Sequence, residues 1–310
     1  MDEDVLRKTY GDYDKSRNFF KHSPTDASYR TFNENAIREI NKRKSERDIL
    51  LCTLGNYQKP IADAVNLMTV EPGIGYTGVF CGNKVFESYA WMHYVYGLMH
   101  IENGQWYDAV IPNYFDVSDY PFNDKKEDYL LYFGRIIGRK GVALASEIAK
   151  ATGNRLYVVG QGSLDNDEEG LHIGSEKHIV YKPAVGPRER AEIMGKAKAV
   201  IMPTYYIEPF GGVNVEAQLM GTPVITTDWG AFPETVLHGV TGYRCRTFEE
   251  FCWAVKNIYR IKCENCREWA EKVAGMYEEY FQRINRLFAS GWYEENPDRR
   301  ELSWLEKYYV

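Results

Sequence analysis

The most constraining feature of this 310-residue chain is the stretch 203–228, in which apolar runs alternate with glycines. A β-rich run at 199–204 leads into a loop, and Gly211 and Gly212 then open a segment with helical apolar spacing. Gly221 ends that helix, and the apolar run at 224–228 predicts a second buried strand. This is a strand–loop–helix–strand unit of a parallel α/β sheet. Because the first amides of a helix lack intrahelical partners and glycine allows close approach, the glycine pair predicts a phosphate site.

Two carboxylates flank this predicted anion site. Glu208 lies in the loop, and Glu216 follows eight residues later, about one turn into the helix. An acid does not help to hold a phosphate, whereas a carboxylate accepts hydrogen bonds from vicinal hydroxyls, which favours a sugar. Taken singly, Glu208 is better explained as a solvated loop acid, and Glu216 as an acid that complements the helix dipole.

The full string resembles a known signature. Glu208-Pro-Phe-Gly-Gly-Val-Asn-Val-Glu216 looks like the E-x7-E motif of retaining glycosyltransferases of family 4, and residues 221–234 and 238–242 continue the same family pattern. The resemblance implies a GT-B fold, an α/β architecture of two Rossmann-like parallel-sheet domains that face a cleft, with C-terminal helices crossing back to the first domain. It also implies that Glu216 holds the ribose hydroxyls and Glu208 the donor sugar near C3. Further donor contacts are then expected from Phe210, Gly211, Gly212 and Val213.

A second group of charges lies at Gly134-Arg-Ile-Ile-Gly-Arg-Lys-Gly141, between a predicted strand and a predicted helix. Arg135 and Lys140 are five residues apart, and a guanidinium and an ammonium in such a loop can reach one diphosphate. The alternative is a pair of solvated loop cations, and Arg139 is an alternative cation for the same role. The string resembles the family's G-R-x4-K-G element, which implies that Arg135 and Lys140 bind the donor pyrophosphate.

The surrounding chain alternates between strands and helices. Strands are expected at 129–133, 155–159, 178–181, 199–204 and 224–228, and helices at 141–152, after 187, at 251–259 and at 264–288. This alternation predicts a doubly wound parallel sheet. In that sheet Gly160 is expected to let the nucleotide approach, and the segment 181–185, which ends at Val185, to contact the base edge.

The length and the 44% hydrophobic content predict two α/β domains. Residues 108–116 resemble the family passage that crosses between domains, and the charged, turn-rich stretch from Tyr120 suits a linker. We therefore predict an acceptor-side domain at 1–120 and a nucleotide-sugar-binding domain at 121–299. A C-terminal helix at 300–310 is expected to pack on the first domain.

The first domain departs from the family pattern. No counterpart of the family's glycine-rich loop is found in 1–47, so this domain is shortened or remodelled. Helices are expected at 27–47, 60–65 and 85–98, and strands at 48–54 and 67–70. Glu71 ends the second strand where the family often has a donor-contacting His, which makes it a candidate catalytic residue; the alternative is that it caps the glycine-rich turn. His93 is the next candidate, although a lone helical His is more often structural.

Composition narrows the function classes. A net charge of −6 and a pI near 5.7 argue against a non-specific nucleic-acid binder and give no support for docking on anionic membranes. Six scattered cysteines favour reduced thiols, and the lone pair Cys263 and Cys266, without a second pair or a nearby His, does not favour zinc. No apolar run is long enough to span a bilayer, and the acidic N-terminus is no signal peptide. The sequence thus predicts a cytoplasmic protein.

We therefore predict a retaining glycosyltransferase that moves a hexose from a nucleotide-diphosphate sugar, such as UDP-glucose, to an acceptor hydroxyl. No metal or other cofactor is required, because Arg135, Lys140 and the helix amides neutralise the phosphates. The partners are the nucleotide sugar and an acceptor that the sequence does not identify; a modified nucleic-acid base is one candidate. The alternatives are another GT-B enzyme, such as a phosphorylase or epimerase, and an inactive or regulatory nucleotide-sugar-binding protein.

Overall fold

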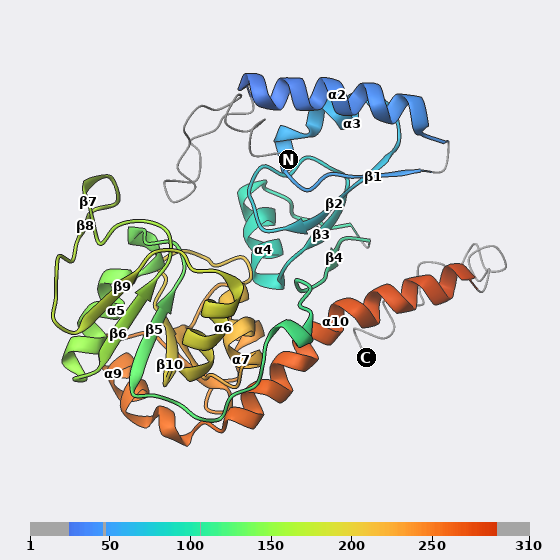
Figure 1. Cartoon of the computed structure of the whole chain (residues 1–310). Coiled ribbons are helices and arrows are strands. Elements are labelled where there is room, and N and C mark those ends of the chain that lie inside the picture. The colour runs from blue at the N-terminus through green and yellow to red at the C-terminus, as the bar shows by residue number, and fades with distance from the viewer. Residues whose placement is uncertain (1–24, 46–47, 106, 290–310) are drawn as a thin grey trace. The chain divides into compact units, whose positions relative to one another are not determined.

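The computed structural model describes residues 25–45, 48–105 and 107–289, and these divide into two compact units. One unit contains Val117–Ala270; the other contains Pro24–Asp116 and continues from Glu271. They are named here the six-stranded unit and the four-stranded unit, after their main sheets (Figure 1). The helix predicted at 300–310 lies outside the described residues.

The six-stranded unit is built on a wholly parallel sheet in the order β12-β11-β10-β5-β6-β9, which confirms the predicted parallel sheet. Its strands are β5 (Tyr129–Phe133), β6 (Arg155–Val159), β9 (Ile179–Lys182), β10 (Ala199–Met202), β11 (Val224–Thr227) and β12 (Gly242–Cys245). Taken from β9 to β12, this is the 3-2-1-4-5-6 order of the doubly wound dinucleotide-binding fold. The winding reverses between β5 and β10. Ligands of such folds bind at the carboxyl ends of these two strands.

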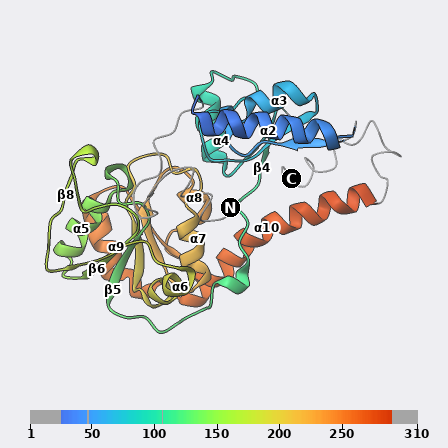
Figure 2. The same cartoon turned by 45° about the horizontal axis from the view of Figure 1, so that its top comes forward.

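Helices cover both faces of this sheet (Figure 2). They are α5 (Val142–Ala151), α6 (Pro187–Lys196), α7 (Gly212–Leu219), α8 (Phe232–Thr235), α9 (Phe248–Asn257) and the start of α10 (Cys263–Ala289). Alternate residues of β5 enter two cores: Leu130 and Tyr132 pack with α5 and α9, whereas Tyr129 and Leu131 pack with α6 and α7. Because both faces of β5, β10 and β11 are buried, these strands are largely apolar runs, which is why their positions could be predicted.

Two further features of the six-stranded unit are a small hairpin and a helix that extends beyond the unit. The loop expected between Gly160 and Gly174 contains a small hairpin of β7 (Asp165–Asn166) and β8 (Leu171–His172). Helix α10 begins in this unit, and from Glu271 onward it belongs to the four-stranded unit, where Tyr277 packs 5.4 Å from Tyr114.

The four-stranded unit has a parallel sheet in the order β1-β2-β3-β4. Its strands are β1 (Ile49–Leu51), β2 (Met68–Ile74), β3 (Asn83–Phe86) and β4 (Ala109–Val110). Apart from the later part of α10, its helices are α2 (Ala27–Arg43), α3 (Lys59–Val65) and α4 (Tyr89–Leu98). Strands β2 and β3 are joined by a loop at 75–82.

Two expectations for this unit were wrong in detail. The helix predicted at 85–98 begins only at Tyr89, because Val85 and Phe86 belong to β3 and Ser88 caps the helix by accepting the Trp91 N–H at 3.0 Å. The strand predicted at 67–70 continues to Ile74, so Glu71 lies inside β2 rather than at its end.

Candidate functional site

A cavity of about 110 Å³ opens where the winding of the six-stranded sheet reverses, at the carboxyl ends of β5 and β10. It brings together six residues predicted from two separate stretches of sequence: Arg135, Lys140, Glu208, Gly211, Gly212 and Val213. The ends of β5 and β10 are neighbours only because these strands pair in parallel. The doubly wound topology therefore assembles the candidate site.

The loop between β5 and α5 is packed tightly against the end of β10. Gly141 precedes α5 with φ +78°, and a Cβ at this position would lie 1.9 Å from the Pro203 carbonyl oxygen. Only glycine fits this left-handed, crowded position. The close approach places Lys140, the preceding residue, next to the loop that carries Glu208.

Lys140 and Glu208 form a buried ion pair. The Lys140 ammonium donates to Glu208 Oε2 at 2.7 Å, and the two side chains are only 15% and 10% exposed. Burial lowers the pKa of Lys140, while the Glu208 carboxylate acts in the opposite direction and favours the charged form. Since an ammonium has three donors, this bond leaves two for the oxygens of a ligand.

The neighbouring cations are placed differently. Arg135 lines the cavity. Arg139 instead lies over the Tyr206 ring, with Cζ 4.8 Å from the ring centroid, and its carbonyl accepts the Tyr205 N–H at 2.9 Å. Of the two alternative arginines, Arg135 is therefore the one that faces the cavity.

The N-terminus of α7 supplies backbone donors to the cavity. Gly211 precedes the helix with φ +77°, and a Cβ there would lie 2.9 Å from a ring carbon of Phe232. No side chain caps this end of the helix. The amides of Gly212 and Val213 therefore point toward the cavity without an intrahelical acceptor, which is the arrangement that binds anions. Phe210, predicted as a donor contact, is buried in the preceding loop.

Thr204 is a cavity residue that the sequence reasoning missed. It lies two residues beyond β10, its side chain is 1% exposed, and its Oγ1 has no hydrogen-bond partner among the described residues. A buried hydroxyl without a partner is costly, which marks it as a group that a ligand would satisfy. The signal that could have found it was a polar residue close to the end of a buried strand at the switch point.

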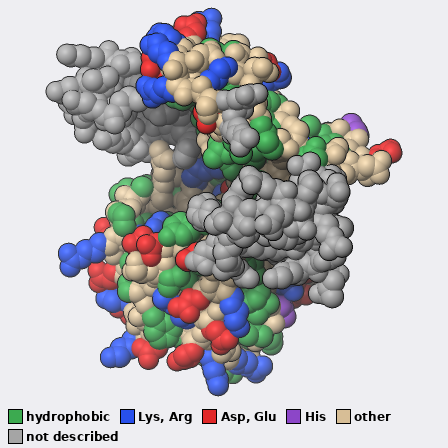
Figure 3. All heavy atoms as spheres, turned by 90° about the vertical axis from the view of Figure 1, so that its right-hand side faces the viewer, with side chains coloured by type: hydrophobic (Ala, Val, Ile, Leu, Met, Phe, Trp, Pro, Cys, Tyr) green, Lys and Arg blue, Asp and Glu red, His purple; other side chains and the backbone are tan. Residues whose placement is uncertain are grey.

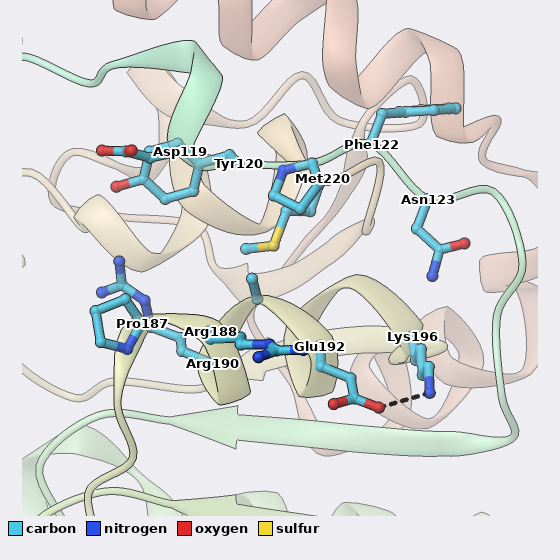
Figure 4. Close-up of a pocket in the computed structure, with 12 residues that line it drawn as sticks. Asp119, Tyr120, Phe122, Asn123, Pro187, Arg188, Arg190, Glu192, Lys196 and Met220 are labelled. Atoms are coloured by element: carbon cyan, nitrogen blue, oxygen red, sulfur yellow. Dashed lines mark hydrogen bonds and ion pairs between the residues drawn. The ribbon is translucent and has the colours of Figure 1, made fainter.

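Glu216 is oriented by two side chains rather than lining this cavity. Arg190 Nη1 lies 3.2 Å from Glu216 Oε1, and the Tyr120 hydroxyl donates to the same oxygen at 3.4 Å. Burial raises the pKa of Glu216, whereas Arg190 and the Tyr120 hydrogen bond act to lower it. Arg190 and Tyr120, both missed from sequence, also line a second cavity of about 770 Å³ (Figure 4).

Gly160 and Val185, both predicted to contact the donor, do not line the cavity and pack against other parts of the six-stranded unit. Gly160 has φ +156°, and a Cβ there would lie 1.8 Å from the Gly134 carbonyl oxygen. Its missing side chain thus makes room for the loop after β5, a different reason from the nucleotide approach predicted for it. Val185 is half-buried and packs against the core beside α6 and α7.

Glu71 lies in the four-stranded unit and is completely buried. Its carboxylate accepts the Tyr76 hydroxyl at 3.0 Å and the amides of Phe80 and Cys81 at 2.9 and 2.7 Å. These contacts fasten the loop that joins β2 to β3. The geometry therefore favours the capping alternative over the catalytic prediction, because no part of the side chain is exposed to a substrate. His93 is exposed on α4.

Two features are absent from the described residues. Among them, no group of three or more His, Cys, Asp or Glu side chains is arranged to hold a metal ion. None of the described helices is both long and apolar enough to cross a membrane.

The reversal of the strand order, the two loops that meet at the cavity and the glycine before α7 define a doubly wound α/β protein with its candidate site at the switch point. Comparison with known proteins then gives the family. Residues 118–275 match the family Glycosyl transferases group 1, and the chain belongs to this family.

Curated relatives match less than half of the chain. A glycogen synthase of Mycobacterium tuberculosis is 33% identical over 151 residues, which cover 44% of this chain and 36% of that protein. A D-inositol 3-phosphate glycosyltransferase of Segniliparus rotundus is 33% identical over 130 residues, 38% of this chain and 29% of the relative. The match thus spans only about a third of the length of these relatives.

Solved structures extend the similarity over most of the chain. AviGT4, a glycosyltransferase involved in avilamycin A biosynthesis, has a TM-score of 0.63 at 20% identity and covers 83% of this chain and 79% of its own. Anabaena Alr3699/HepE in complex with UDP and glucose has a TM-score of 0.66 at 15% identity and covers 92% and 89%. At these identities the similarity shows the fold, and the predicted GT-B fold class is confirmed.

Proposed function

We propose that this chain is a retaining glycosyltransferase that transfers a hexose from a UDP-sugar to an acceptor hydroxyl. Family membership supports the reaction class, and the structural similarity to a protein solved with UDP-glucose supports the donor class. The observation that carries the proposal is the cavity at the switch point, where Arg135, Lys140 and the first amides of α7 surround one space. Two cations and a helix N-terminus are suited to a diphosphate.

The proposed step needs charge stabilisation on the leaving group. The bond between the sugar C1 and the diphosphate oxygen breaks, and a bond from C1 to the acceptor oxygen forms on the same face of the sugar. The acceptor proton passes to the departing phosphate. Arg135, Lys140 and the amides of Gly212 and Val213 stabilise the negative charge that develops on the diphosphate, which is why we propose that no metal ion is required.

Glu208 has a double role in this proposal. Its Oε2 accepts from Lys140, which keeps the buried ammonium charged beside the diphosphate. The Tyr206 hydroxyl also bonds to this carboxylate, but each carboxylate oxygen accepts more than one hydrogen bond, so Glu208 can still accept a hydroxyl of the donor sugar. The two roles fix the sugar relative to the phosphates, and such orientation matters most in the transition state.

A carbohydrate hydroxyl is the proposed acceptor. On the face shown in Figure 3, acidic and basic side chains are intermixed over the six-stranded unit. A polyanion such as nucleic acid is held by a field of positive charge, and an intermixed surface does not supply one. The net charge of −6 likewise gives the chain no general attraction for nucleic acid, so we favour a sugar hydroxyl over a modified nucleic-acid base as the acceptor.

The experiment is a UDP-release assay with UDP-glucose and a panel of hydroxyl acceptors, followed by NMR of the product anomer. We expect acceptor-dependent UDP release in EDTA and an α-configured product. A β-configured product would contradict the retaining mechanism. A folded protein that binds UDP-glucose but neither transfers nor hydrolyses it would instead support the inactive sugar-nucleotide-binding alternative.

A further inference from the structure

We propose that Arg190 and Tyr120 are positioning residues that hold Glu216 ionised and oriented toward a ribose hydroxyl. This inference rests on the proposed function, because it assigns to Glu216 the nucleotide's ribose as its partner. It extends that function to two side chains that come from α6 and from the segment just after Asp119. Neither residue contacts the diphosphate cavity lined by Arg135 and Lys140.

The contacts to the Glu216 carboxylate are one-sided. Arg190 Nη1 and the Tyr120 hydroxyl both approach Oε1, at 3.2 and 3.4 Å. Within the described part of the chain, no hydrogen bond or ion pair reaches Oε2. One oxygen is thus anchored by the protein, and the other is left to accept a hydrogen bond from a ligand hydroxyl. A carboxylate held in this way loses little further freedom when it binds.

The charge of Arg190 also counteracts the effect of burial. The Glu216 side chain is only 14% exposed, and burial favours its neutral form, whereas Arg190 favours the ionised form. The ionised form is the one that the proposed role requires, because only a carboxylate has both oxygens available as acceptors. Without Arg190, the carboxyl would take up a proton at a higher pH.

The backbone of Tyr120 is linked to the end of α7 through Arg267. Arg267 Nη1 donates to the Tyr120 carbonyl at 2.6 Å and to the Leu219 carbonyl, at the end of α7, at 2.7 Å. The Arg190 guanidinium lies 5.9 Å from the centre of the Tyr120 ring. Both partners of Glu216 are therefore held in place relative to the helix that carries it.

An ordinary surface ion pair on the same helix provides the contrast. Lys196 and Glu192 form a 2.9 Å pair further along α6, but their side chains are 40% and 64% exposed, although both line the cavity of Figure 4. Such exposed pairs contribute little. The pair between Arg190 and Glu216 is 30% and 14% exposed, so solvent screens it much less.

The test measures UDP affinity by calorimetry at pH 6 and pH 8 in Arg190→Gln, Glu216→Gln and the double variant. If Arg190 acts through Glu216, Arg190→Gln should weaken UDP binding on the order of tenfold at pH 8 and more at pH 6, because the carboxyl is now protonated more readily. Arg190→Lys should restore part of the affinity. In the Glu216→Gln background, the Arg190→Gln substitution should weaken UDP binding by less than about a further twofold.

The matched control is Arg188→Gln, which removes an arginine from the same helix and the same cavity. No hydrogen bond or ion pair joins Arg188 to Glu216 in the described residues, so its UDP affinity should stay within about twofold of wild type at both pH values. If Arg190→Gln fails to fold, Tyr120→Phe replaces it: loss of the hydroxyl should weaken UDP binding about threefold, and only when Glu216 is present.

Two results would overturn the inference, and they are distinguishable from failure of the proposed function. An Arg190→Gln loss that is equal at both pH values and undiminished beside Glu216→Gln would show a structural role only. Wild-type affinity in Glu216→Gln would show that Glu216 does not hold the nucleotide, while the glycosyltransferase proposal could still stand on transfer activity. Wild-type protein that binds no UDP would contradict both.

Discussion

The Lys140 ammonium donates to Glu208 Oε2 at 2.7 Å, and this bond joins two loops whose residues are 68 positions apart in the sequence. It links the loop after β5 to the loop that precedes α7, so the proposed phosphate cation and the proposed sugar-binding acid form one buried pair. Removal of either charge leaves the other buried without its partner. At either residue, a substitution that keeps the side-chain shape should therefore affect transfer and UDP binding differently from one that removes the contact between the two side chains.

Glu208→Gln tests the assignment of Glu208 to the donor sugar. The substitution keeps the shape and a hydrogen-bond acceptor for Lys140 but removes the charge. UDP should bind within a few-fold of wild type, because the bound diphosphate then takes the place of the carboxylate as the anion beside Lys140. Transfer from UDP-glucose should fall on the order of 10²-fold, because the lost contact orients the sugar in the transition state. Calorimetry with UDP and turnover with the intact donor separate these effects. Equal losses in both would place Glu208 on the nucleotide instead.

Lys140→Met tests the source of the positive charge. Transfer should fall on the order of 10³-fold, because the developing charge on the diphosphate loses a buried cation. The matched control is Lys150→Met on α5, whose lysine is 54% exposed and pairs with Glu176 at the surface; it should be nearly neutral. Both measurements are made with and without EDTA. Wild-type activity that is lost in EDTA and restored by Mn²⁺ would contradict metal independence.

Thr204→Val tests the buried hydroxyl of the cavity. Valine has almost the same shape but no polar atom, so the unfolding free energy should stay the same or rise by about 1 kcal/mol when the unpartnered Oγ1 is removed. Affinity for UDP or UDP-glucose should fall severalfold if a ligand satisfies that hydroxyl. Urea denaturation and calorimetry on the same preparations give both numbers. Lower stability with unchanged affinity would mean that Thr204 serves the fold alone.

Much of the six-stranded unit could be predicted because its information is local. A fully buried parallel strand is an uninterrupted apolar run, so β5, β6, β10 and β11 were found close to their observed positions. Gly211 and Gly212 marked the helix start, and the switch point followed once the strands alternated with helices. The convergence of Arg135, Lys140 and Glu208 on one cavity is a consequence of this topology.

The remaining features depend on contacts distant in the sequence or on backbone geometry. The Tyr120 hydroxyl donates a hydrogen bond to Glu216, 96 positions away in the sequence, and no local sequence pattern predicts this contact. Gly160 is predicted to let the nucleotide approach because a glycine after a strand is typical of such sites; the structure adds a packing reason, since a Cβ there would lie 1.8 Å from the Gly134 carbonyl oxygen in the loop after β5. Glu71 followed an apolar run and was placed at a strand end, but β2 continues through Pro72 to Ile74.

Glu71→Gln distinguishes a structural acid from a catalytic one. The carboxylate accepts two amides and a phenol in a fully buried position, so loss of its charge should reduce the unfolding free energy by about 2–4 kcal/mol. Turnover of the folded fraction should stay within a few-fold of wild type. Glu102→Gln, an exposed acid of the same unit, is the control and should leave the unfolding midpoint unchanged. An unaltered midpoint with a 10²-fold loss of transfer would restore the catalytic prediction, on the scale of general-base loss.

Gly141→Ala tests whether the packing of the loop after β5 against Pro203 sets the geometry of the site. Gly141 combines φ +78° with a Cβ position 1.9 Å from the Pro203 carbonyl oxygen, so alanine must displace backbone. Gly153, at the other end of α5, has a similar φ of +69° but nothing within 4 Å of its Cβ position, so Gly153→Ala isolates the cost of the left-handed backbone alone. That control should lose about 1–2 kcal/mol of unfolding free energy. Gly141→Ala should lose at least about 3 kcal/mol, because steric displacement adds to the same backbone strain. It should also weaken UDP binding, since the displaced loop carries Lys140 away from Glu208, whereas Gly153→Ala should bind UDP as wild type does. Equal stability losses in the two variants, with UDP affinity intact in both, would show that the contact with Pro203 is not what positions Lys140.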